Sequence, residues 1–321
     1  MPAISASYPG KIILFGEHAV VYNSHAIAIP VSQVKSRAVI QPLLSAPAGT
    51  IEINAVDTHT RANLNDLPQN HPLATAIRLT LKQLTIQTPP AFIVRASSEI
   101  PMSAGLGSGA SISCSIIRAV SNYLGKPLPA ADISALAFEV EKIHHGNPSG
   151  VDNTVIAFNQ PILFKRGEAM QPVVVGSELH FLIADTGLKA STAEVVAGVR
   201  SRWQAEPERY NTFFHQVDAI TLSALAAIRA GQIAEIGRLM SENHRVLQSM
   251  AVSHPALDRL AEAARSAGAY GAKLSGAGAG GNLIALVAGE QQDQLERSFL
   301  QAGATRVIRT TLIRTGQVEA R

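Results

Sequence analysis

The sequence has little of several features that mark whole classes of protein. It contains one cysteine, Cys114, among 321 residues, which excludes a framework of internal disulfides and favours a reducing cytosol. Its apolar runs stay well short of the roughly 18 residues that a membrane span requires. Residues 1–10 lack the basic and then apolar layout of a secretory signal. We therefore expect a cytoplasmic protein without a membrane partner.

A marked excess of charge of either sign is also missing. Lys and Arg number 27 and Asp and Glu number 24, so the formal net charge is +3. This surplus is too small to indicate a nucleic-acid partner, although the pI is about 9.1. Hydrophobic residues make up 46% and charged residues 16% of the chain, which is not the composition of a disordered protein.

The sequence motifs of several well-known classes of functional site are absent. No lysine stands where G-x-x-x-x-G-K-[ST] needs one, and the H-R-D and D-F-G signatures are missing, which excludes a Walker A loop and a protein kinase. Without G-x-S-x-G we do not expect a serine hydrolase of that type. Neither H-E-x-x-H nor a thiolate cluster accompanies His144 and His145, so we do not expect zinc there.

The length of the chain and the mixture of helix and strand patterns predict an α+β protein of two domains, residues 1–172 and 173–321. We place the domain boundary within residues 165–178. In the first part we expect strands at residues 11–15, 26–29, 34–40 and 91–96, and helices at 73–84, 111–124 and 131–143. In the second part we expect helices at residues 191–202, 208–229, 233–247, 255–267 and 291–302, and strands at 282–288 and 306–313.

A loop with alternating glycines separates the expected strand 91–96 from the expected helix 111–124. Residues 104–111 have the sequence Ala-Gly-Leu-Gly-Ser-Gly-Ala-Ser. Glycines let backbone N–H groups converge on an anion, and the N-terminus of the helix that follows adds unpaired donors and partial positive charge. An ordinary strand-to-helix turn needs one glycine, so the three glycines indicate a phosphate-binding loop.

A second glycine-rich segment, residues 273–281, has the sequence Lys-Leu-Ser-Gly-Ala-Gly-Ala-Gly-Gly. Gly276, Gly278 and Gly281 match the letters G-x-G-x-x-G, but the dinucleotide fingerprint follows a strand and opens a helix. Here we expect a helix before the segment and a strand after it. We therefore expect a glycine bend that lies close to a ligand or packs against the first loop.

Ionisable residues interrupt two compact segments. Lys11, Glu17 and His18 lie in the apolar run 9–21, and each needs a partner or a function because an unpaired buried charge is costly. An ion pair between Lys11 and Glu17 and a structural role for His18 are the plain alternatives. Glu141 and Asp152 flank a Pro/Gly loop that can bring two carboxylates into one cleft, where one could ligate Mg²⁺ and the other contact a hydroxyl.

Three segments occur in an order that resembles the motifs of the GHMP small-molecule kinases, the superfamily of galactose, homoserine, mevalonate and phosphomevalonate kinases. They are residues 9–21, 100–108 and 273–281. Segments 15–21 and 145–153 are most similar to those of the mevalonate kinases. The resemblance extends from residue 9 to about residue 288.

This resemblance implies the α+β, two-domain GHMP kinase fold, with a ribosomal-protein-like α/β N-terminal domain and a ferredoxin-like α+β C-terminal domain. It implies a kinase that uses ATP and Mg²⁺ to convert mevalonate to mevalonate 5-phosphate, an isoprenoid precursor. Mevalonate would be the small-molecule partner, and a homodimer is one assembly that the resemblance allows. The alternatives are another GHMP-type kinase (phosphomevalonate kinase, mevalonate 3-kinase or sugar kinase) and, from a different class, a nucleotide-binding regulator without turnover.

The resemblance also implies a role for each matching residue. Asp152 would be the catalytic carboxylate that faces the hydroxyl, Lys11 would lie beside it, and Glu141 would ligate Mg²⁺. The phosphates of ATP would be bound by Pro101, Ala104, Gly105, Leu106, Gly107, Ser108, Gly109, Ala110 and Ser111. The substrate side would comprise Glu17, His18, Thr192, Ser275, Gly276 and Ala277.

One position departs from the family pattern. The family usually has Gly-Leu-Gly-Ser-Ser-Ala, whose second serine supplies a hydroxyl on the Mg²⁺ side, and this chain has Gly109 there. We expect Ser108 or Ser111 to take over as the hydroxyl ligand, with Ser108 as the first choice. Water is the further alternative, because Mg²⁺ commonly keeps several waters.

Overall fold

The computed structural model describes residues 3–101, 105–145 and 148–316, without the side chains of residues 144 and 145. The chain divides into two compact units that interleave in sequence. Unit 1 consists of Met1–Lys11, Pro30–Met102 and Leu106–Asn159. Unit 2 consists of Ile12–Ile29, Ser103–Gly105 and Gln160–Arg321. Strands β1 (Ile4–Phe15) and β2 (Ala26–Pro42) each continue along the chain from one unit into the other.

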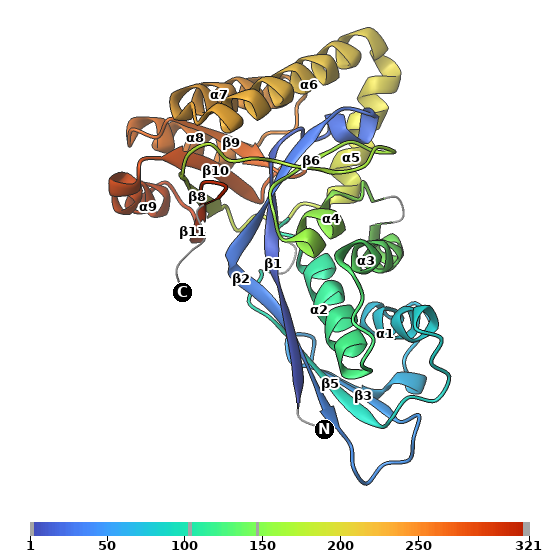
Figure 1. Ribbon diagram of the computed structural model, residues 1–321. Helices are drawn as coiled ribbons and strands as arrows, with labels where there is room; N and C mark the ends of the chain where they lie inside the picture. Colours follow the sequence, from blue (N-terminus) through green and yellow to red (C-terminus); the bar gives the residue numbers. More distant parts are fainter. Residues whose placement is uncertain (1–2, 102–104, 146–147, 317–321) are drawn as a thin grey trace. The chain divides into compact units, whose positions relative to one another are not determined.

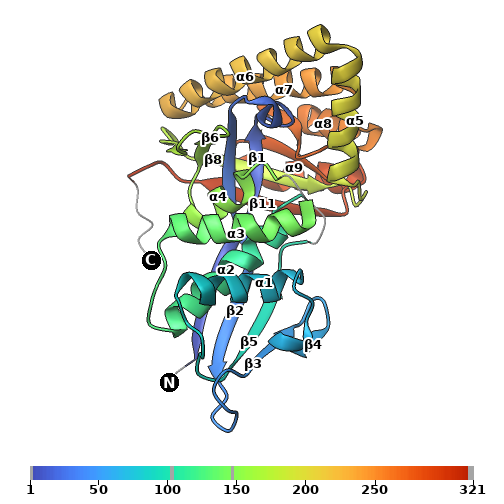
Figure 2. The same cartoon turned by 90° about the vertical axis from the view of Figure 1, so that its right-hand side faces the viewer.

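Unit 1 is built on part of a mixed sheet in which β4, β3, β5 and β2 follow one another, and β1 also pairs with β2. Its further strands are β3 (Ile51–Ala55), β4 (Thr60–Asn63) and β5 (Phe92–Ser98). Its helices are α1 (Pro72–Gln83), α2 (Ser108–Tyr123), α3 (Ala130–His145) and α4 (Val151–Phe158), with the short 3-10 turn η2 (Leu64–Asp66). Strands β3 and β5 run parallel, and α1, α2 and α3 lie side by side over the sheet (Figure 2).

Helix α2 shows why this unit forms as it does. Ile116, Ile117 and Val120 are fully buried along one side of the helix, as the spacing of apolar residues in the sequence predicts. That side packs against α1, α3 and β5. Burial of this stripe places the N-terminus of α2, where the glycine loop ends, at a defined position beside β1 and β2.

Unit 2 contains a four-stranded antiparallel sheet of β8 (Leu179–Asp185), β9 (Gly271–Ser275), β10 (Asn282–Val287) and β11 (Arg306–Leu312). The strands lie side by side in the order β11-β8-β10-β9. Numbered by their order along the chain, they are the fourth, first, third and second strands of this sheet. Helices precede the β9–β10 hairpin and follow it, which is the β-α-β-β-α-β arrangement of a ferredoxin-like domain. The expectation for the C-terminal part is thereby confirmed.

The helices of unit 2 are α5 (Thr192–Ala205), α6 (Pro207–Ala230), α7 (Ile233–Ser249), α8 (Pro255–Ser266) and α9 (Gln292–Gln301). The unit also holds the 3-10 turns η1 (Ala19–Tyr22) and η3 (Gly289–Gln291), and the short strands β6 (Ile162–Phe164) and β7 (Gln171–Pro172). Strand β6 pairs with the beginning of β2. Helices α6 and α7 lie side by side (Figure 1).

The structure differs from the prediction at several elements, and strands β3 and β4 were not predicted. The expected helix 255–267 is present as α8, but strand β9, which was not predicted, lies between this helix and the second glycine segment. The segment is the tip of the β9–β10 hairpin, and because a strand follows it, the dinucleotide fingerprint is still excluded. Helix α4 begins right after Gly150 and was not predicted, since its eight residues are too few for a clear period. The expected strands 26–29 and 34–40 form one strand, β2.

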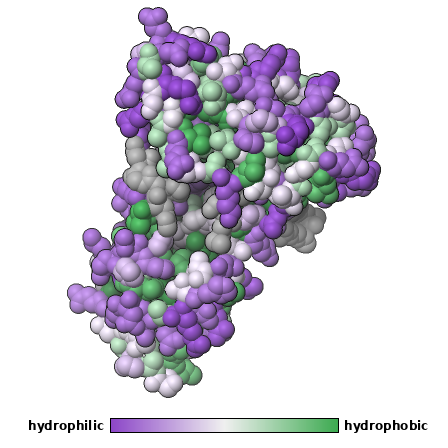
Figure 3. All heavy atoms as spheres, turned by 180° about the vertical axis from the view of Figure 1, so that it is seen from behind, coloured by the Kyte–Doolittle hydropathy of each residue, from purple (hydrophilic) through white to green (hydrophobic). Residues whose placement is uncertain are grey.

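The surface of the molecule is mixed in polarity. On the face shown in Figure 3, hydrophilic side chains alternate with small apolar patches. Within the described part of the chain, none of the helices combines the length and hydropathy of a bilayer span.

Candidate functional site

Lys11 and Asp152 form the central ion pair of unit 1. Lys11 lies near the end of β1 and Asp152 in the first turn of α4, and their Nζ and Oδ1 atoms are 2.8 Å apart. The Lys11 side chain is 5% exposed and that of Asp152 is 32% exposed. A largely buried cation therefore holds a carboxylate that is still open to a ligand. The plain alternative, in which Lys11 pairs with Glu17, is wrong.

The first glycine loop is packed onto Lys11. The backbone N–H of Lys11 donates to the carbonyl oxygen of Leu106 at 2.9 Å. Gly107 has φ +73°, and a Cβ at this position would lie 2.8 Å from Cγ of Lys11. Both the left-handed backbone and the close approach require glycine. The loop and the charged pair are therefore parts of one structure.

Helix α2 begins where this loop ends, with Gly107 as its N-cap. The first turn consists of Ser108, Gly109, Ala110 and Ser111 and so carries no acidic side chain. The N–H of Ser111 donates to the oxygen of Gly107 at 2.9 Å, whereas the N–H groups before it precede the first intrahelical bond. This helix end has the donors and the partial positive charge that bind a phosphate group.

The two serines of the first turn differ in what their hydroxyls contact. Ser111 is fully buried, and its hydroxyl donates to the oxygen of Tyr8 at 2.9 Å and lies 2.6 Å from Oγ of Ser36. Ser108 is only half-buried, and its Oγ lies 3.5 Å from Oγ of Ser98. Ser111 is therefore engaged in holding α2 against β1 and β2, and Ser108 is the hydroxyl of this turn that a ligand can reach.

Glu141 adds a second carboxylate to this group from the C-terminal part of α3. The residue is 4% exposed. Burial and the nearby charge of Asp152 raise the pKa of Glu141 to about 7, and Lys11 opposes this shift. A carboxyl group under this desolvation is strongly stabilised in its charged form by any cation that binds beside it.

Glu17 and Lys273 form a second ion pair, in unit 2. Both side chains are fully buried, and Nζ of Lys273 donates to Oε1 of Glu17 and, at 2.7 Å, to the oxygen of Leu274. Burial lowers the pKa of Lys273, while Glu17 opposes the shift. This pair connects the turn after β1 with β9. Lys273 was not among the predicted site residues, although a lysine inside an apolar strand is a signal for a buried charge.

His18 occupies a strained turn next to this pair. Its φ is +60° and its ψ is −50°, and the N–H of Ala19 donates to the oxygen of Glu17 at 2.6 Å, which is a γ-turn of the uncommon kind with positive φ. Nε2 of His18 lies 2.8 Å from the oxygen of Ala277. Burial lowers the pKa of His18 to about 4, so the neutral ring donates from Nε2 at neutral pH.

The start of the second glycine segment is held by further contacts inside unit 2. The hydroxyl of Ser275 donates to the oxygen of Ile13 at 2.7 Å, and the N–H of Leu274 donates to Nδ1 of His244 at 3.2 Å. Gly276 follows with φ +88°. Ser275, Gly276 and Ala277 are therefore tied to the same stretch of chain that carries Glu17 and His18. Thr192, by contrast, is exposed at the first position of α5.

Some predicted residues give less information. Ala104 lies outside the described residues, as do the side chains of His144 and His145. Pro101 is half-buried and Gly105 is exposed. Among the residues whose placement is described, no three His, Cys, Asp or Glu side chains are grouped closely enough for a metal centre made of such ligands alone.

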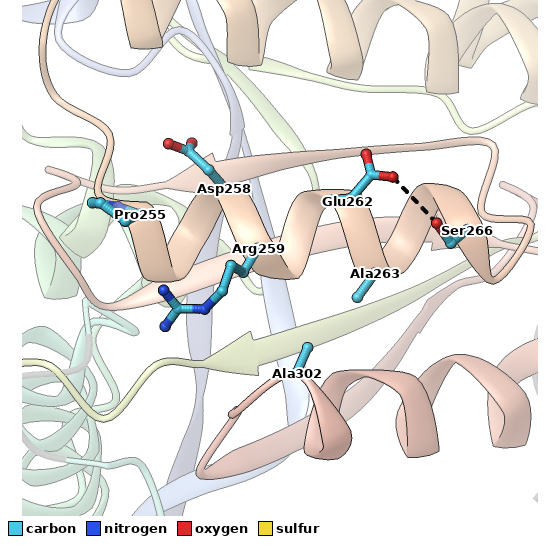
Figure 4. Close-up of a pocket in the computed structure, with 7 residues that line it drawn as sticks. All are labelled: Pro255, Asp258, Arg259, Glu262, Ala263, Ser266 and Ala302. Atoms are coloured by element: carbon cyan, nitrogen blue, oxygen red, sulfur yellow. Dashed lines mark hydrogen bonds between the residues drawn. The ribbon is translucent and has the colours of Figure 1, made fainter.

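A surface pocket of about 620 Å³ lies elsewhere in unit 2, between α8 and the end of α9 (Figure 4). Its lining consists of Pro255, Asp258, Arg259, Glu262, Ala263, Ser266 and Ala302. The hydroxyl of Ser266 donates to Glu262 at 3.3 Å on the same helix. None of the predicted site residues lines this pocket, so the pocket is separate from the groups described above.

Comparison with known proteins shows which protein family has these motifs. Residues 71–160 match the model of the GHMP kinases N terminal domain, and residues 224–305 match that of the GHMP kinases C terminal domain. Mevalonate kinase of Pyrococcus horikoshii is 32% identical to the chain over 96% of each sequence.

Two solved structures extend the similarity to the fold. The crystal structure of the Methanococcus jannaschii mevalonate kinase has a TM-score of 0.85 at 30% identity and covers 97% of this chain and 98% of its own. That of the L. major mevalonate kinase in complex with R-mevalonate has a TM-score of 0.82 at 27% identity and covers 98% and 97%. These matches confirm the expected two-domain fold class.

Proposed function

Because the chain belongs to the GHMP kinase family, and within it to the mevalonate kinases, we propose that it transfers the γ-phosphate of ATP to the primary hydroxyl of mevalonate and so forms mevalonate 5-phosphate. The observation that carries the proposal is the Lys11–Asp152 pair, whose lysine packs against the glycine loop that leads into α2. Such a transfer needs a cation, an accessible carboxylate and a helix N-terminus that can bind a phosphate group.

In this mechanism Asp152 orients the hydroxyl that attacks the γ-phosphorus. The new bond forms between the hydroxyl oxygen and phosphorus, the bond from phosphorus to the bridging oxygen of ATP breaks, and ADP leaves. The transition state is loose, so the hydroxyl proton passes to the carboxylate of Asp152 late in the step. Lys11, at 2.8 Å from Asp152, keeps that carboxylate in place and stabilises negative charge on the attacking oxygen.

The first loop binds the phosphates through its backbone. The first-turn N–H groups of α2 are aligned with the helix axis and preorganised, so binding an anion costs little reorganisation. We assign phosphate binding to residues 105–110, and to Pro101 and Ala104, which precede them in the sequence. Ser111 closes this turn, since its N–H donates to the oxygen of Gly107 and its hydroxyl donates to the oxygen of Tyr8.

The side chains near this loop fit a magnesium ion. Mg²⁺ is usually bound by one or two carboxylates together with substrate phosphates and water, and Glu141 and Ser108 would supply such oxygen atoms. A buried carboxyl whose pKa is raised to about 7 is a group that a cation would stabilise. When bound, the ion would neutralise charge on the phosphates.

The substrate side is proposed to depend on the motif residues of unit 2. Glu17 and His18 are buried and bond to Lys273 and to the oxygen of Ala277. We assign them the task of fixing the hairpin tip that starts with Ser275, Gly276 and Ala277, whose backbone would face the substrate. Thr192, exposed at the start of α5, is assigned to a direct polar contact with it.

A substrate panel tests the proposal. ADP release is measured with mevalonate, phosphomevalonate, galactose and homoserine, and we expect turnover with mevalonate. The product is then examined by phosphorus NMR with proton coupling. A phosphate on the primary carbon couples to two protons, whereas one on the tertiary carbon has no proton at three bonds. Turnover with another acceptor, a product without that coupling, or no turnover at all would each contradict the proposed reaction.

A further inference from the structure

The second glycine segment, residues 273–281, has few side chains that could hold it in place. Its conformation therefore depends on the contacts that its backbone makes with other parts of unit 2. Gly278 has φ +82°, and a Cβ at this position would clash with the oxygen of Val252. The N–H of Ala279 donates to the same oxygen at 2.8 Å. The connection between α7 and α8, which contains Val252, therefore holds the tip of the segment.

His244, in the last part of α7, holds the start of the segment. Its Nδ1 accepts a hydrogen bond from the N–H of Leu274 at 3.2 Å. Strand β9, which contains Leu274, is at the edge of its sheet, and Leu274 is fully buried. Without His244 this N–H would be a buried donor that has lost its acceptor, which is costly. The ring of His244 therefore fixes the edge of β9 just before the glycines begin.

The surroundings of the His244 ring keep Nδ1 available as an acceptor. The residue is 6% exposed. Burial lowers the pKa of His244, Asp258 opposes this shift, and the charge of Lys273 adds to it. Nε2 lies 3.3 Å from Oδ1 of Asp258, and the hydroxyl of Ser253 donates to that carboxylate oxygen at 2.6 Å. The neutral ring therefore carries its proton on Nε2, toward Asp258, and accepts at Nδ1.

Between these two anchors lie the residues that we assign to the substrate side. The hydroxyl of Ser275 donates to the oxygen of Ile13, and the oxygen of Ala277 accepts from His18. Gly276, between them, has φ +88°, and among the described residues no atom lies within 4 Å of a Cβ built there. The segment is thus fixed at both ends, while its backbone at Gly276 borders open space. A surface that receives a ligand needs this combination.

We propose that His244 is a positioning residue for the acceptor substrate: by accepting the N–H of Leu274, it holds the start of the second glycine segment so that the backbone of residues 275–277 keeps the arrangement that binds the substrate. This inference rests on the proposed function, because that function assigns these three residues to the substrate side. His244 contacts Leu274 and acts on the substrate through the segment.

The test compares two substitutions of His244 that differ in whether they keep a hydrogen-bond acceptor. In His244→Asn the side-chain oxygen can take the place of Nδ1, although the smaller side chain leaves a cavity. In His244→Leu the apolar side chain fills more of the space but cannot accept. We expect His244→Leu to raise the KM of mevalonate by about tenfold, with kcat within about threefold of the wild type. His244→Asn should keep this KM within about threefold of the wild type, even if its melting temperature is the lower of the two.

Hydrogen–deuterium exchange of a peptide that covers residues 275–281 follows the segment without any ligand. We expect faster exchange in His244→Leu and unchanged exchange in His244→Asn. Thr221→Val is the matched control, because Thr221 is fully buried in α6 and its hydroxyl donates to the oxygen of Val217 in the same helix. This variant loses a buried hydrogen bond that does not involve the segment. It should leave the KM of mevalonate and the exchange of this peptide unchanged.

Three results would each overturn the proposal. They are a rise in KM of less than about threefold in His244→Leu, an equal rise in both His244 variants, and unchanged exchange of the peptide in His244→Leu. The proposed reaction fails separately. If the panel shows turnover with another acceptor, the KM comparison is made with that acceptor, and without any turnover the exchange comparison decides. If mevalonate is phosphorylated while both His244 variants keep the wild-type KM, the reaction stands and the role of His244 is wrong.

Discussion

At the scale of the residue, Asp152 combines two properties that a catalytic carboxylate needs. Its ion pair with Lys11 fixes its position, and its 32% exposure leaves it open to a ligand. Glu141 lies close by but is almost fully buried. The same kind of side chain can therefore serve the hydroxyl in one case and a cation in the other, because the surroundings differ.

The first prediction concerns Asp152. We expect Asp152→Asn to lower kcat by about 10²-fold or more, the scale of general-base contributions, with ADP affinity largely retained. Steady-state kinetics and calorimetry check this. Asp132→Asn is the matched control, since Asp132 is also an acidic residue in the first turn of a helix, α3. Near-normal turnover of the Asp152 variant would sink the assignment.

A second prediction follows from the buried ring of His18. Its pKa is about 4 in the folded protein and 6.5 for the free side chain, so between these values the unfolded chain binds more protons. The stabilisation is complete above pH 6.5 and is lost as the pH falls toward 4. We expect the free energy of unfolding to drop by about 2 kcal/mol from this group between pH 7 and pH 5.

Urea denaturation at the two pH values measures this drop. The glutamine of His18→Gln does not titrate, so the free energy of unfolding of this variant should depend less on pH. The variant should also be less stable than the wild type at pH 7, because the hydrogen bond to Ala277 changes. His254→Gln is the control, since His254 is a cap residue of α8 outside this cluster. An unchanged pH dependence in the His18 variant would show that the ring is not neutral in the folded state.

At the scale of the element, the β9–β10 hairpin depends on the turn that follows β1. Strand β9 carries Lys273 in its middle and Ser275 at its end, and both bond to residues 13–17. A charged residue at the centre of a fully buried strand is stable only with its partner in place. The local fold of the hairpin is therefore decided by residues more than 250 positions earlier in the sequence.

A double-mutant cycle tests this dependence. Lys273→Met leaves Glu17 buried without its cation, and Glu17→Gln leaves the lysine without its anion, so each single variant should lose about 3–5 kcal/mol of stability. The double variant should lose clearly less than the sum, because neither charge is then left buried alone. Additive losses in urea denaturation would show that the two groups do not stabilise each other.

At the scale of the whole molecule, the two compact units do not follow one another along the chain. Residues 12–29 belong to unit 2, although most of unit 2 comes from residues 160–321. Ala19 lies in the hydrophobic core of that unit, and the ring of Tyr22 stacks on that of Phe214 at 4.0 Å. The division after residue 172, the cytosolic location and a homodimer stay predictions.

These contacts predict how a fragment of the chain would behave. Residues 173–321 alone lack Ala19, Tyr22 and Glu17, so the core has a gap and Lys273 has no carboxylate. We expect this fragment to melt at a lower temperature than the full chain, or not to fold. Adding residues 12–29 through a flexible linker should raise its melting temperature, as followed by circular dichroism. A fragment as stable as the full chain would contradict the assigned role of residues 12–29.

Much of the secondary structure could be predicted from the sequence. The apolar spacing predicts helices at 73–84 and 111–124, and the structure has α1 at Pro72–Gln83 and α2 at Ser108–Tyr123. Amphipathic helices are predictable because the period is a property of the local sequence. Strand β9 and helix α4 were missed. They have five and eight residues, and each contains a charged residue, so the apolar spacing is too weak to identify either element.

By itself, the sequence determined the glycine loop at the start of α2, the main helices and the motifs that place the chain among the GHMP kinases, because these depend on residue types at short spacing. Only the tertiary structure decided that Lys11 pairs with Asp152 while Glu17 pairs with Lys273, and that Ser111 is engaged where Ser108 is accessible. Ion-pair partners and burial arise when distant segments meet. The energetic cost of burying a charge or a hydroxyl is therefore settled only in the folded chain.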